Sequence, residues 1–313
     1  MSGVAIVGST MIEHFTYLKR APGPGETVVG DRTAIGYGGK GANQAVMARN
    51  LGSRVAMVNC LGDDAHGNIY REKLQAMGVD TTHMHTAKGM ASGAAPIWVE
   101  ADGTNRIIVV PGANNELTPG QAVAAVDALK ASVVVGQFEI LQNVTAAAFA
   151  EAKKQGAITV LNPAPASTVD PSLLASSDWI IPNESEFVLL ATGAPPSDGG
   201  LPSDEAILGY ATHLRSQSLS TRLLVTLGAA GVALVSREGD QVTRLTPPTT
   251  TDVVDTTGAG DAFVGAFAHG LASGLSEEDA CKLGMACASD SVRREGTQVA
   301  FPTHERCQAL GLI

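Results

Sequence analysis

Val253-Val254-Asp255-Thr256-Thr257-Gly258-Ala259-Gly260-Asp261-Ala262-Phe263 is a stretch that predicts a strand, a glycine turn and the start of a helix, in that order. The apolar lead-in ends at Asp255, and residues 262–271 are rich in Ala, Phe and Leu. At a helix start the first backbone N–H groups lack intrahelical partners, and the helix dipole favours negative charge. The amides of Gly258, Ala259 and Gly260 are therefore expected to face an anion such as a phosphate.

Asp261 falls in the first turn of this predicted helix. A carboxylate there often caps the helix or complements its dipole. It can also act as a general base beside a cradle for a phosphoryl group. The spacing of one short glycine motif favours the capping role, so other parts of the chain have to decide between the two.

Length and composition bound the fold and the partners. A chain of 313 residues fits one large α/β domain with a small insertion, or two domains of ordinary size. The formal net charge of −10, without a run of Lys or Arg, predicts no nucleic acid partner. An anionic small ligand remains compatible, because helix N-termini and a divalent cation can hold phosphates.

The compartment is inferred from cysteines and apolar runs. The four cysteines form no C-x-x-C pair, which indicates neither a zinc site nor a disulfide framework and favours a reducing compartment. The first residues lack the pattern of a signal peptide, and no apolar run is long enough to cross a membrane. We therefore expect a cytoplasmic protein with no membrane partner.

Two stretches differ from the rest of the chain. Residues 10–37 contain prolines, glycines and short alternating pieces at 27–29 and 32–35, and residues 91–111 include a predicted hairpin around Asp102-Gly103. They predict a small β insertion that serves as a lid on a single domain spanning residues 1–313.

Outside the insertion, predicted strands alternate with predicted helices, a pattern typical of right-handed βαβ units. The expected strands are 4–7, 55–60, 133–138, 158–161, 179–181 and 223–227, with a hairpin at 232–245. The expected helices are 45–51, 68–77, 121–129, 144–155, 184–191, 204–217, 262–271 and 278–293. Residues 193–202 are interpreted as a surface loop rather than a domain linker.

A second glycine turn, residues 36–44, also opens a helix. It matches G-x-G-x-x-G, and Asp63 and Asp64 lie at about the distance of a ribose-binding acid, so a dinucleotide site is a real alternative. Against it, the segment before Gly36 is the broken insertion rather than a buried strand. Gly41 after Lys40 also excludes the P-loop pattern, which needs Ser or Thr there.

Gly38-Gly39-Lys40-Gly41-Ala42-Asn43-Gln44 and Asp255-Thr256-Thr257-Gly258-Ala259-Gly260-Asp261 together resemble the two signatures of the PfkB carbohydrate kinases, most of all its ribokinase branch. The similarity covers the full length through Gly8-Ser9, Gly62-Asp63-Asp64, Asn162-Pro163-Ala164-Pro165, Asn183-Glu184-Ser185-Glu186 and Thr226-Leu227-Gly228. It implies a Rossmann-like, doubly wound central sheet flanked by helices, with a small β-sheet lid that forms a homodimer contact.

The resemblance also implies roles at the reacting centre. Asp261 matches the base that takes a proton from the sugar hydroxyl, and the amides of Gly258, Ala259 and Gly260 match the anion hole. Sugar contacts are implied for Met11, Glu13, Gly39, Lys40, Asn43 and Glu139. Nucleotide contacts are implied for Asn183, Thr226, Gly228 and Gly260.

Two cations are implied in the same way. Asn183 and Glu186 would organise Mg²⁺ through waters, although a capping pair is the alternative at these two positions. A K⁺ ion would bind the carboxylate of Asp255, the carbonyl of Thr257 and the later loop, mostly through backbone atoms of Ser291, Arg294, Gly296 and Ala300.

The chain departs from the family pattern at two places. Met11-Ile12-Glu13 stands where many relatives have Asn-x-Asp, so Glu13 keeps a carboxylate while Met11 cannot donate a hydrogen bond. Ala300 stands where relatives often have Ser near the K⁺ site. The expected activity is ATP-dependent phosphorylation of D-ribose at its 5-hydroxyl. Alternatives are another sugar or nucleoside, a nicotinamide-dependent oxidoreductase that uses residues 36–41, and a non-catalytic sugar-binding regulator.

Overall fold

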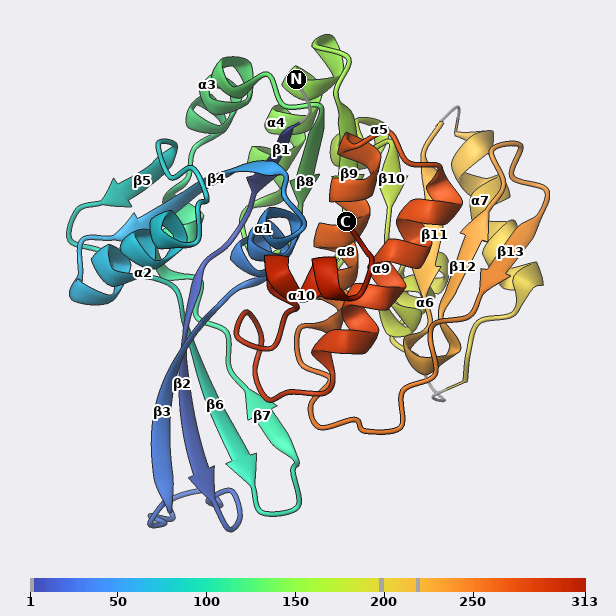
Figure 1. The fold of residues 1–313 in the computed structure, drawn as a ribbon. Helices are drawn as coiled ribbons and strands as arrows, with labels where there is room; N and C mark the ends of the chain where they lie inside the picture. Colours follow the sequence, from blue (N-terminus) through green and yellow to red (C-terminus); the bar gives the residue numbers. More distant parts are fainter. Residues whose placement is uncertain (1–2, 197–199, 218–219) are drawn as a thin grey trace.

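A nine-stranded sheet forms the centre of the computed structural model, which describes residues 3–196, 200–217 and 220–313 (Figure 1). The strand order is β13-β12-β11-β10-β9-β8-β1-β4-β5. Pairing is parallel from β11 to β5 and antiparallel at β12 and β13. Their bounds are β1 Gly3–Val7, β4 Arg54–Gly62, β5 Met84–Ala87, β8 Val133–Gly136, β9 Ile158–Leu161, β10 Trp179–Ile180, β11 Arg222–Thr226, β12 Val232–Val235 and β13 Val242–Leu245.

Helices cover both faces of this sheet, because its strands are apolar on both sides. In β1, Val4 and Ile6 join one buried cluster, and Ala5 and Val7 join the other. The first cluster includes side chains of α1 Lys40–Asn50, α2 Ala65–Ala76, α8 Ala259–Ala272, α9 Glu277–Ser291 and α10 His304–Ala309. The second includes side chains of α3 Pro119–Leu129, α4 Gln142–Lys154, α5 Pro171–Ala175, α6 Glu184–Thr192 and α7 Asp204–Ser216. The doubly wound sheet is confirmed.

Four further strands form a separate small sheet that projects from the main body (Figure 1). These strands are β2 Met11–Leu18, β3 Arg32–Gly38, β6 Ala94–Glu100 and β7 Asn105–Ile107, in the order β3-β2-β6-β7. β2 and β6 pair in parallel, so they join two stretches that are distant in sequence. β6 and β7 form the hairpin predicted around Asp102-Gly103, while residues 27–29 are not a strand.

The structure differs from the sequence prediction just before α8. The strand expected at Val253-Val254-Asp255 is wrong: this segment is irregular, and Val253 and Val254 are exposed. Apolar residues predict a buried strand only if another layer covers them, and none does here. The sequence also did not indicate α5, α10 or the 3-10 turns Gly112–Glu116 and Gly228–Ala230. In the loop predicted at 193–202, residues 197–199 lie outside the described residues. In the ranges that the structure describes, no helix is long and apolar enough to cross a membrane.

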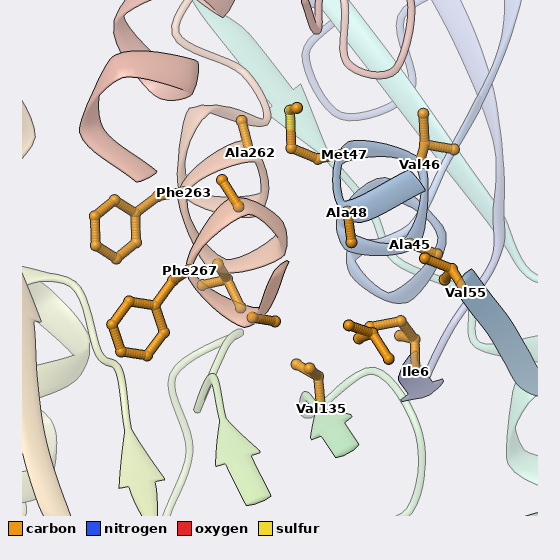
Figure 2. Close-up of a cluster of buried hydrophobic side chains, with 14 of the residues drawn as sticks. Ile6, Ala45, Val46, Met47, Ala48, Val55, Val135, Ala262, Phe263 and Phe267 are labelled. Carbon is orange, nitrogen blue, oxygen red and sulfur yellow. The ribbon is translucent and has the colours of Figure 1, made fainter. Parts of the chain in front are cut away.

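The packing of α1 against α8 positions the site described below. Figure 2 shows side chains of both helices lying over Ile6 and Val135 of the sheet. Gly265 of α8 lies directly against α1, because a Cβ built there would be 2.5 Å from the carbonyl oxygen of Gln44 and 2.9 Å from the Cβ of Met47. The two helices approach closely because residue 265 has no side chain.

Gly265→Ala should lower the free energy of unfolding by about 1–3 kcal/mol, the usual cost of overpacking. Gly209→Ala is the control, since no atom lies within 4 Å of a Cβ at that exposed position of α7. It should raise the free energy of unfolding by about 0.5–1 kcal/mol, because Ala is the better helix former. Denaturant titration measures both variants. Equal effects would show that α1 and α8 do not meet at Gly265.

Candidate active site

The carboxyl ends of the parallel strands bring predicted site residues such as Glu139 and Asn183 to one edge of the sheet, together with Ser9 and Asn162. Ser9 follows β1, Glu139 follows β8, Asn162 follows β9 and Asn183 follows β10. In open α/β sheets this edge is where ligands bind. The N-termini of α1 and α8 lie at the same edge, because side chains of Asn43 and Gln44 reach Asp261.

Asp261 is held by the side chains of α1 rather than by its own helix. Its Oδ2 accepts a hydrogen bond from Asn43 Nδ2 at 2.9 Å, and its Oδ1 accepts one from Gln44 Nε2 at 2.9 Å. The N-cap of α8 is Gly258, and no side chain caps this helix. The carboxylate is 7% exposed, yet it makes no capping bond. This geometry differs from that of a capping acid.

Further buried amides hold the two partners of Asp261. Gln44 Nε2 also donates to Asn162 Oδ1 at 3.1 Å, and Gln44 Oε1 accepts from Gln137 Nε2 at 2.6 Å. On the other side, Asn43 Oδ1 accepts from Gln298 Nε2 at 3.1 Å. The sequence did not indicate roles for Gln44, Gln137 and Gln298. Only the position of Gln44 inside a recognised motif could have drawn attention to it.

The glycine turn before α8 leaves backbone donors open. Gly258 has a φ of 78°, a left-handed conformation that glycine adopts without strain. Among the described residues, the N–H groups of Gly258 and Gly260 have no protein acceptor. The Ala259 amide instead donates to the Thr256 carbonyl at 3.2 Å. Two of the three expected amides are thus free to face an anion.

Glu139 and Lys40 form a charged group beside Asp261. Glu139 Oε2 accepts bonds from the Ser9 hydroxyl and, at 2.9 Å, from the Lys40 backbone N–H. Burial by itself would lower the pKa of the Lys40 ammonium, but the carboxylates of Asp261, Glu139 and Glu186 hold it above its usual value. Lys40 therefore stays charged among three acids.

Glu13 and Met11 lie at the base of the small sheet. Glu13 is 8% exposed and packs against Gly36 and Gly38, where a Cβ would collide with its carboxylate. Burial first, and then the charges of Asp261, Glu139 and Asp255, raise the pKa of Glu13 to about 7. Met11 is buried in a cluster with Ala95 and Ile97. Gly39 has a φ of 93° and lies so close to the Thr10–Met11 backbone that a side chain would not fit.

Asn183 and Glu186 form a capping box at the start of α6. Asn183 Oδ1 accepts from the Glu186 N–H and Glu186 Oε2 accepts from the Asn183 N–H, each at 2.9 Å. Burial is the largest effect on Glu186 and raises its pKa above the usual value. In the described part of the chain no group of three or more His, Cys, Asp and Glu side chains is arranged to hold a metal ion. Nearby, Thr226 ends β11 and Gly228 begins the following turn.

Asp255 connects the glycine turn to the loop after α9. It is half-buried at the end of an irregular segment, not fully buried at the end of a strand as expected. Its Oδ1 accepts from the Thr257 N–H and hydroxyl at 2.9 and 2.6 Å, and its Oδ2 accepts from the Gly296 N–H at 2.9 Å. Asp255 thus fixes Thr257 against Gly296.

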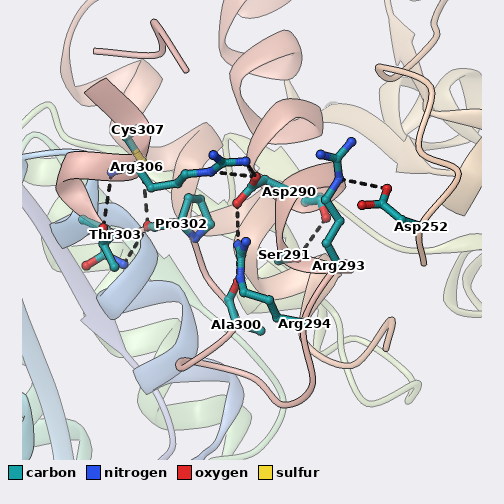
Figure 3. Close-up of polar contacts among 12 residues, drawn as sticks. Asp252, Asp290, Ser291, Arg293, Arg294, Ala300, Pro302, Thr303, Arg306 and Cys307 are labelled. Atoms are coloured by element: carbon teal, nitrogen blue, oxygen red, sulfur yellow. Dashed lines mark hydrogen bonds and ion pairs between the residues drawn. The ribbon is translucent and has the colours of Figure 1, made fainter. Parts of the chain in front are cut away.

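Internal bonds already occupy part of the expected K⁺ ligand set. The Ala300 carbonyl accepts from the Arg294 guanidinium at 2.7 and 2.9 Å, and the Ser291 carbonyl accepts from the Arg294 N–H at 3.2 Å. Figure 3 shows Arg294 between Ala300 and Asp290, with Arg306 on the other side of Asp290. The donor set closest to the glycine turn is therefore Asp255, Thr257 and Gly296.

The glycine motif at residues 36–41 lacks the context of a dinucleotide site. It follows β3 of the small sheet, whose residues are mostly exposed or half-buried, and not a buried strand of the parallel sheet. The dinucleotide fingerprint requires a preceding strand of that kind. The nicotinamide alternative therefore loses its structural basis.

Comparison with known proteins gives consistent matches over the chain. A family model described as pfkB family carbohydrate kinase matches residues 1–304. The chain is similar to the deoxyribokinase of Salmonella typhi, with 36% identity over 97% of this chain and 96% of that protein. It is similar to the ribokinase of Mus musculus, with 36% identity over 96% and 92%. Its structure is similar to that of Arabidopsis thaliana ribokinase complexed with ribose and ATP, with a TM-score of 0.86, 29% identity and coverage of 99% and 98%.

Glu13→Gln should stabilise the sugar-free protein at neutral pH. Between pH 4.5 and about 7 the native Glu13 keeps a proton that the unfolded chain has lost, so the stability of the wild type falls as pH rises through this window. The Glu13→Gln protein has no carboxyl group at this position, so its stability should not fall in this pH window. Its advantage should vanish below pH 4.5 and reach about 3 kcal/mol above pH 7, given the size of the shift.

Denaturant titrations from pH 4 to 8 measure this difference. Glu26→Gln is the control, because a hydrogen bond from Arg20 lowers the pKa of this exposed carboxyl to about 2, so its neutralisation should not stabilise. A Glu13→Gln advantage that does not change with pH would contradict the burial of a charge at this position.

Proposed function

The chain belongs to the pfkB family of carbohydrate kinases, and on this basis we propose that it transfers the γ-phosphoryl group of ATP to the 5-hydroxyl of D-ribose. One observation carries the proposal: the carboxylate of Asp261 is held by two amides beside the free N–H groups of Gly258 and Gly260. A base next to open anion donors is what phosphoryl transfer to a hydroxyl requires.

Asp261 acts as the general base. Each of its oxygens accepts one amide N–H, and a carboxylate oxygen has a further acceptor site, so a sugar hydroxyl can still donate to it. The hydroxyl oxygen forms a bond to the γ-phosphorus while the bond from this phosphorus to the bridging oxygen breaks. The proton passes to Asp261, and ADP leaves. The Gly258 and Gly260 amides and the Lys40 ammonium stabilise the charge that develops on the phosphoryl oxygens.

The sugar is held by residues on both sides of Asp261. Glu139, Glu13 and Asn43 offer acceptors and donors to hydroxyls, and Gly39 lets the backbone approach closely. Asn43 uses one N–H and one lone pair internally, which leaves one of each for the sugar. The small sheet acts as a lid over this side of a single domain and provides the contact for a homodimer.

A second substrate, 2-deoxy-D-ribose, is favoured by two observations. The deoxyribokinase of Salmonella typhi is as similar to this chain, at 36% identity, as the ribokinase of Mus musculus. In addition, Met11 cannot donate a hydrogen bond to a hydroxyl, unlike the Asn of many relatives. We therefore propose that the enzyme accepts both sugars.

The nucleotide lies across the ends of β10 and β11. Thr226, Gly228 and Gly260 line its site. Asn183 and Glu186 would organise Mg²⁺ through waters, and the ion would neutralise charge on the phosphates. The capping box uses Glu186 Oε2 and leaves Oε1 free to accept from such a water. ATP as donor is supported by the ATP in the Arabidopsis thaliana structure. The proposed compartment is the cytoplasm.

Asp255 and its neighbours would hold a monovalent cation that supports the anion hole. Asp255 and the Thr257 and Gly296 carbonyls offer oxygen ligands next to Gly258, and oxygen ligands suit K⁺. The Ala300 and Ser291 carbonyls contribute less, because Arg294 already donates to both. Bound there, K⁺ would hold the glycine turn in its phosphate-facing conformation and so contribute through preorganisation.

Asp261→Asn tests the proposed mechanism. It keeps the size of the side chain but removes the base and sets an N–H₂ group against Asn43 Nδ2 or Gln44 Nε2, so kcat should fall by at least roughly 10²-fold while ATP affinity stays nearly unchanged. ADP release coupled to D-ribose and to 2-deoxy-D-ribose gives the rates. Asp279→Asn is the matched control, because Asp279 is also a first-turn acid but accepts from Ser276 at the start of α9. If Asp261→Asn turns over within a few-fold of the control, Asp261 is not the base.

Replacing Na⁺ by K⁺ at constant ionic strength should raise both the activity and the melting temperature. Asp255→Ala should abolish both responses, because it removes the only charged ligand of the proposed site. The measurement is a KCl titration against choline chloride, with ATP and Mg²⁺ saturating for the assay. If added KCl changes neither the activity nor the melting temperature of protein shown to be free of K⁺, the cation proposal is contradicted. The kinase proposal would remain intact.

A further inference from the structure

Gln298 lies in the loop between α9 and α10 and reaches the active site through its side chain. It is 8% exposed. Its Nε2 group donates to Asn43 Oδ1 at 3.1 Å and to the Tyr70 hydroxyl at 2.7 Å. One buried amide group thus joins α1, which carries Asn43, to α2, which carries Tyr70.

The donor and acceptor of every hydrogen bond from Asp261 through Asn43 and Gln298 to Tyr70 follow from the carboxylate of Asp261. A carboxylate only accepts, so Asn43 must turn its Nδ2 towards Asp261, and its Oδ1 then faces Gln298. Gln298 must therefore present its Nε2 group to Asn43. The second N–H of that group goes to the oxygen of Tyr70, which itself donates to the Gly38 carbonyl. If the amide of Asn43 or Gln298 were flipped, two donors or two acceptors would face each other.

We propose that Gln298 is a positioning residue for phosphoryl transfer, acting through Asn43 to hold Asp261 in line with the sugar hydroxyl. The inference rests on the proposed function. Without the Gln298 donor, only the bond to Asp261 holds the Asn43 amide. The Asn43 side chain can then swing away from its position and carry the carboxylate of Asp261 out of line with the sugar hydroxyl. A misplacement of about 1 Å in a reacting group can cost roughly 10²-fold in rate.

The second bond of Gln298 separates two ways in which it could act. Tyr70 connects it to the carbonyl of Gly38, the last residue of β3 in the small sheet. If Gln298 acted through the small sheet, Tyr70→Phe would reproduce its loss. Because the proposal assigns the effect to Asn43, Tyr70→Phe should leave kcat within about three-fold of wild type.

Gln298→Leu is the decisive variant, since it keeps a similar size and removes both donors. The expected result is a fall in kcat of roughly 10- to 100-fold, with the KM for ATP and the Kd for the sugar within about three-fold of wild type. Thr297→Val is the matched control. Thr297 is buried to a similar degree, and Val keeps its branched shape while it removes only the hydroxyl. It should keep the wild-type kcat.

The outcomes distinguish a positioning role of Gln298 from a purely structural one. A Gln298→Leu protein with a lower melting temperature and unchanged kcat would overturn the proposal, because Gln298 would then only stabilise the loop. If Gln298→Leu does not fold, Gln298→Glu replaces it. This ionised acceptor faces Asn43 Oδ1, so kcat should again fall, and an unchanged kcat would again overturn the proposal.

Wild-type protein is assayed first. If no sugar elicits ADP release from it, the proposed function fails and this inference with it, whereas a wild-type rate in the variants overturns this inference alone.

Discussion

The two hydrogen bonds from Asn43 and Gln44 to the carboxylate of Asp261 are the interaction on which the rest of the site depends. They connect the first turns of α1 and α8, which begin more than two hundred residues apart in the sequence. The helices approach closely at Gly265, one turn further along α8, and this close packing brings the side chains of α1 within reach of Asp261. The sheet beneath fixes both helices through Ile6 and its neighbours, so packing in the core determines where the carboxylate of Asp261 lies.

The site contains several acids, yet it can accept a phosphate-bearing substrate because positive charge and N–H donors lie beside these acids. Acids surround Lys40 and hold its ammonium charged, while the open amides of Gly258 and Gly260 add donors without adding a full charge. Glu13 stands apart, since burial raises its pKa to about 7. A protein with a net charge of −10 can thus still offer one edge of its sheet to phosphate.

The sequence predicted the alternation of strands and helices and the first turn of α8, because these follow from local patterns. It failed where tertiary contacts decide: Val253 and Val254 are apolar, but nothing covers them, so they form no strand. It also could not indicate Gln298, whose partner Asn43 is 255 residues away. The sequence favoured a capping role for Asp261, but this carboxylate accepts from two side chains of α1 and makes no capping bond. The spacing of one motif carries no information on contacts from another helix.

A crystal structure with D-ribose and a non-hydrolysable ATP analogue would show whether Asp261 is placed to act as the general base. We expect the 5-hydroxyl oxygen within about 2.6–3.2 Å of an Asp261 oxygen, with Asn43 and Gln44 still donating to that carboxylate. The γ-phosphate should then accept from the Gly258 and Gly260 amides. A sugar whose 5-hydroxyl meets Glu13 or Glu139 instead, with Asp261 out of hydrogen-bond reach, would contradict it.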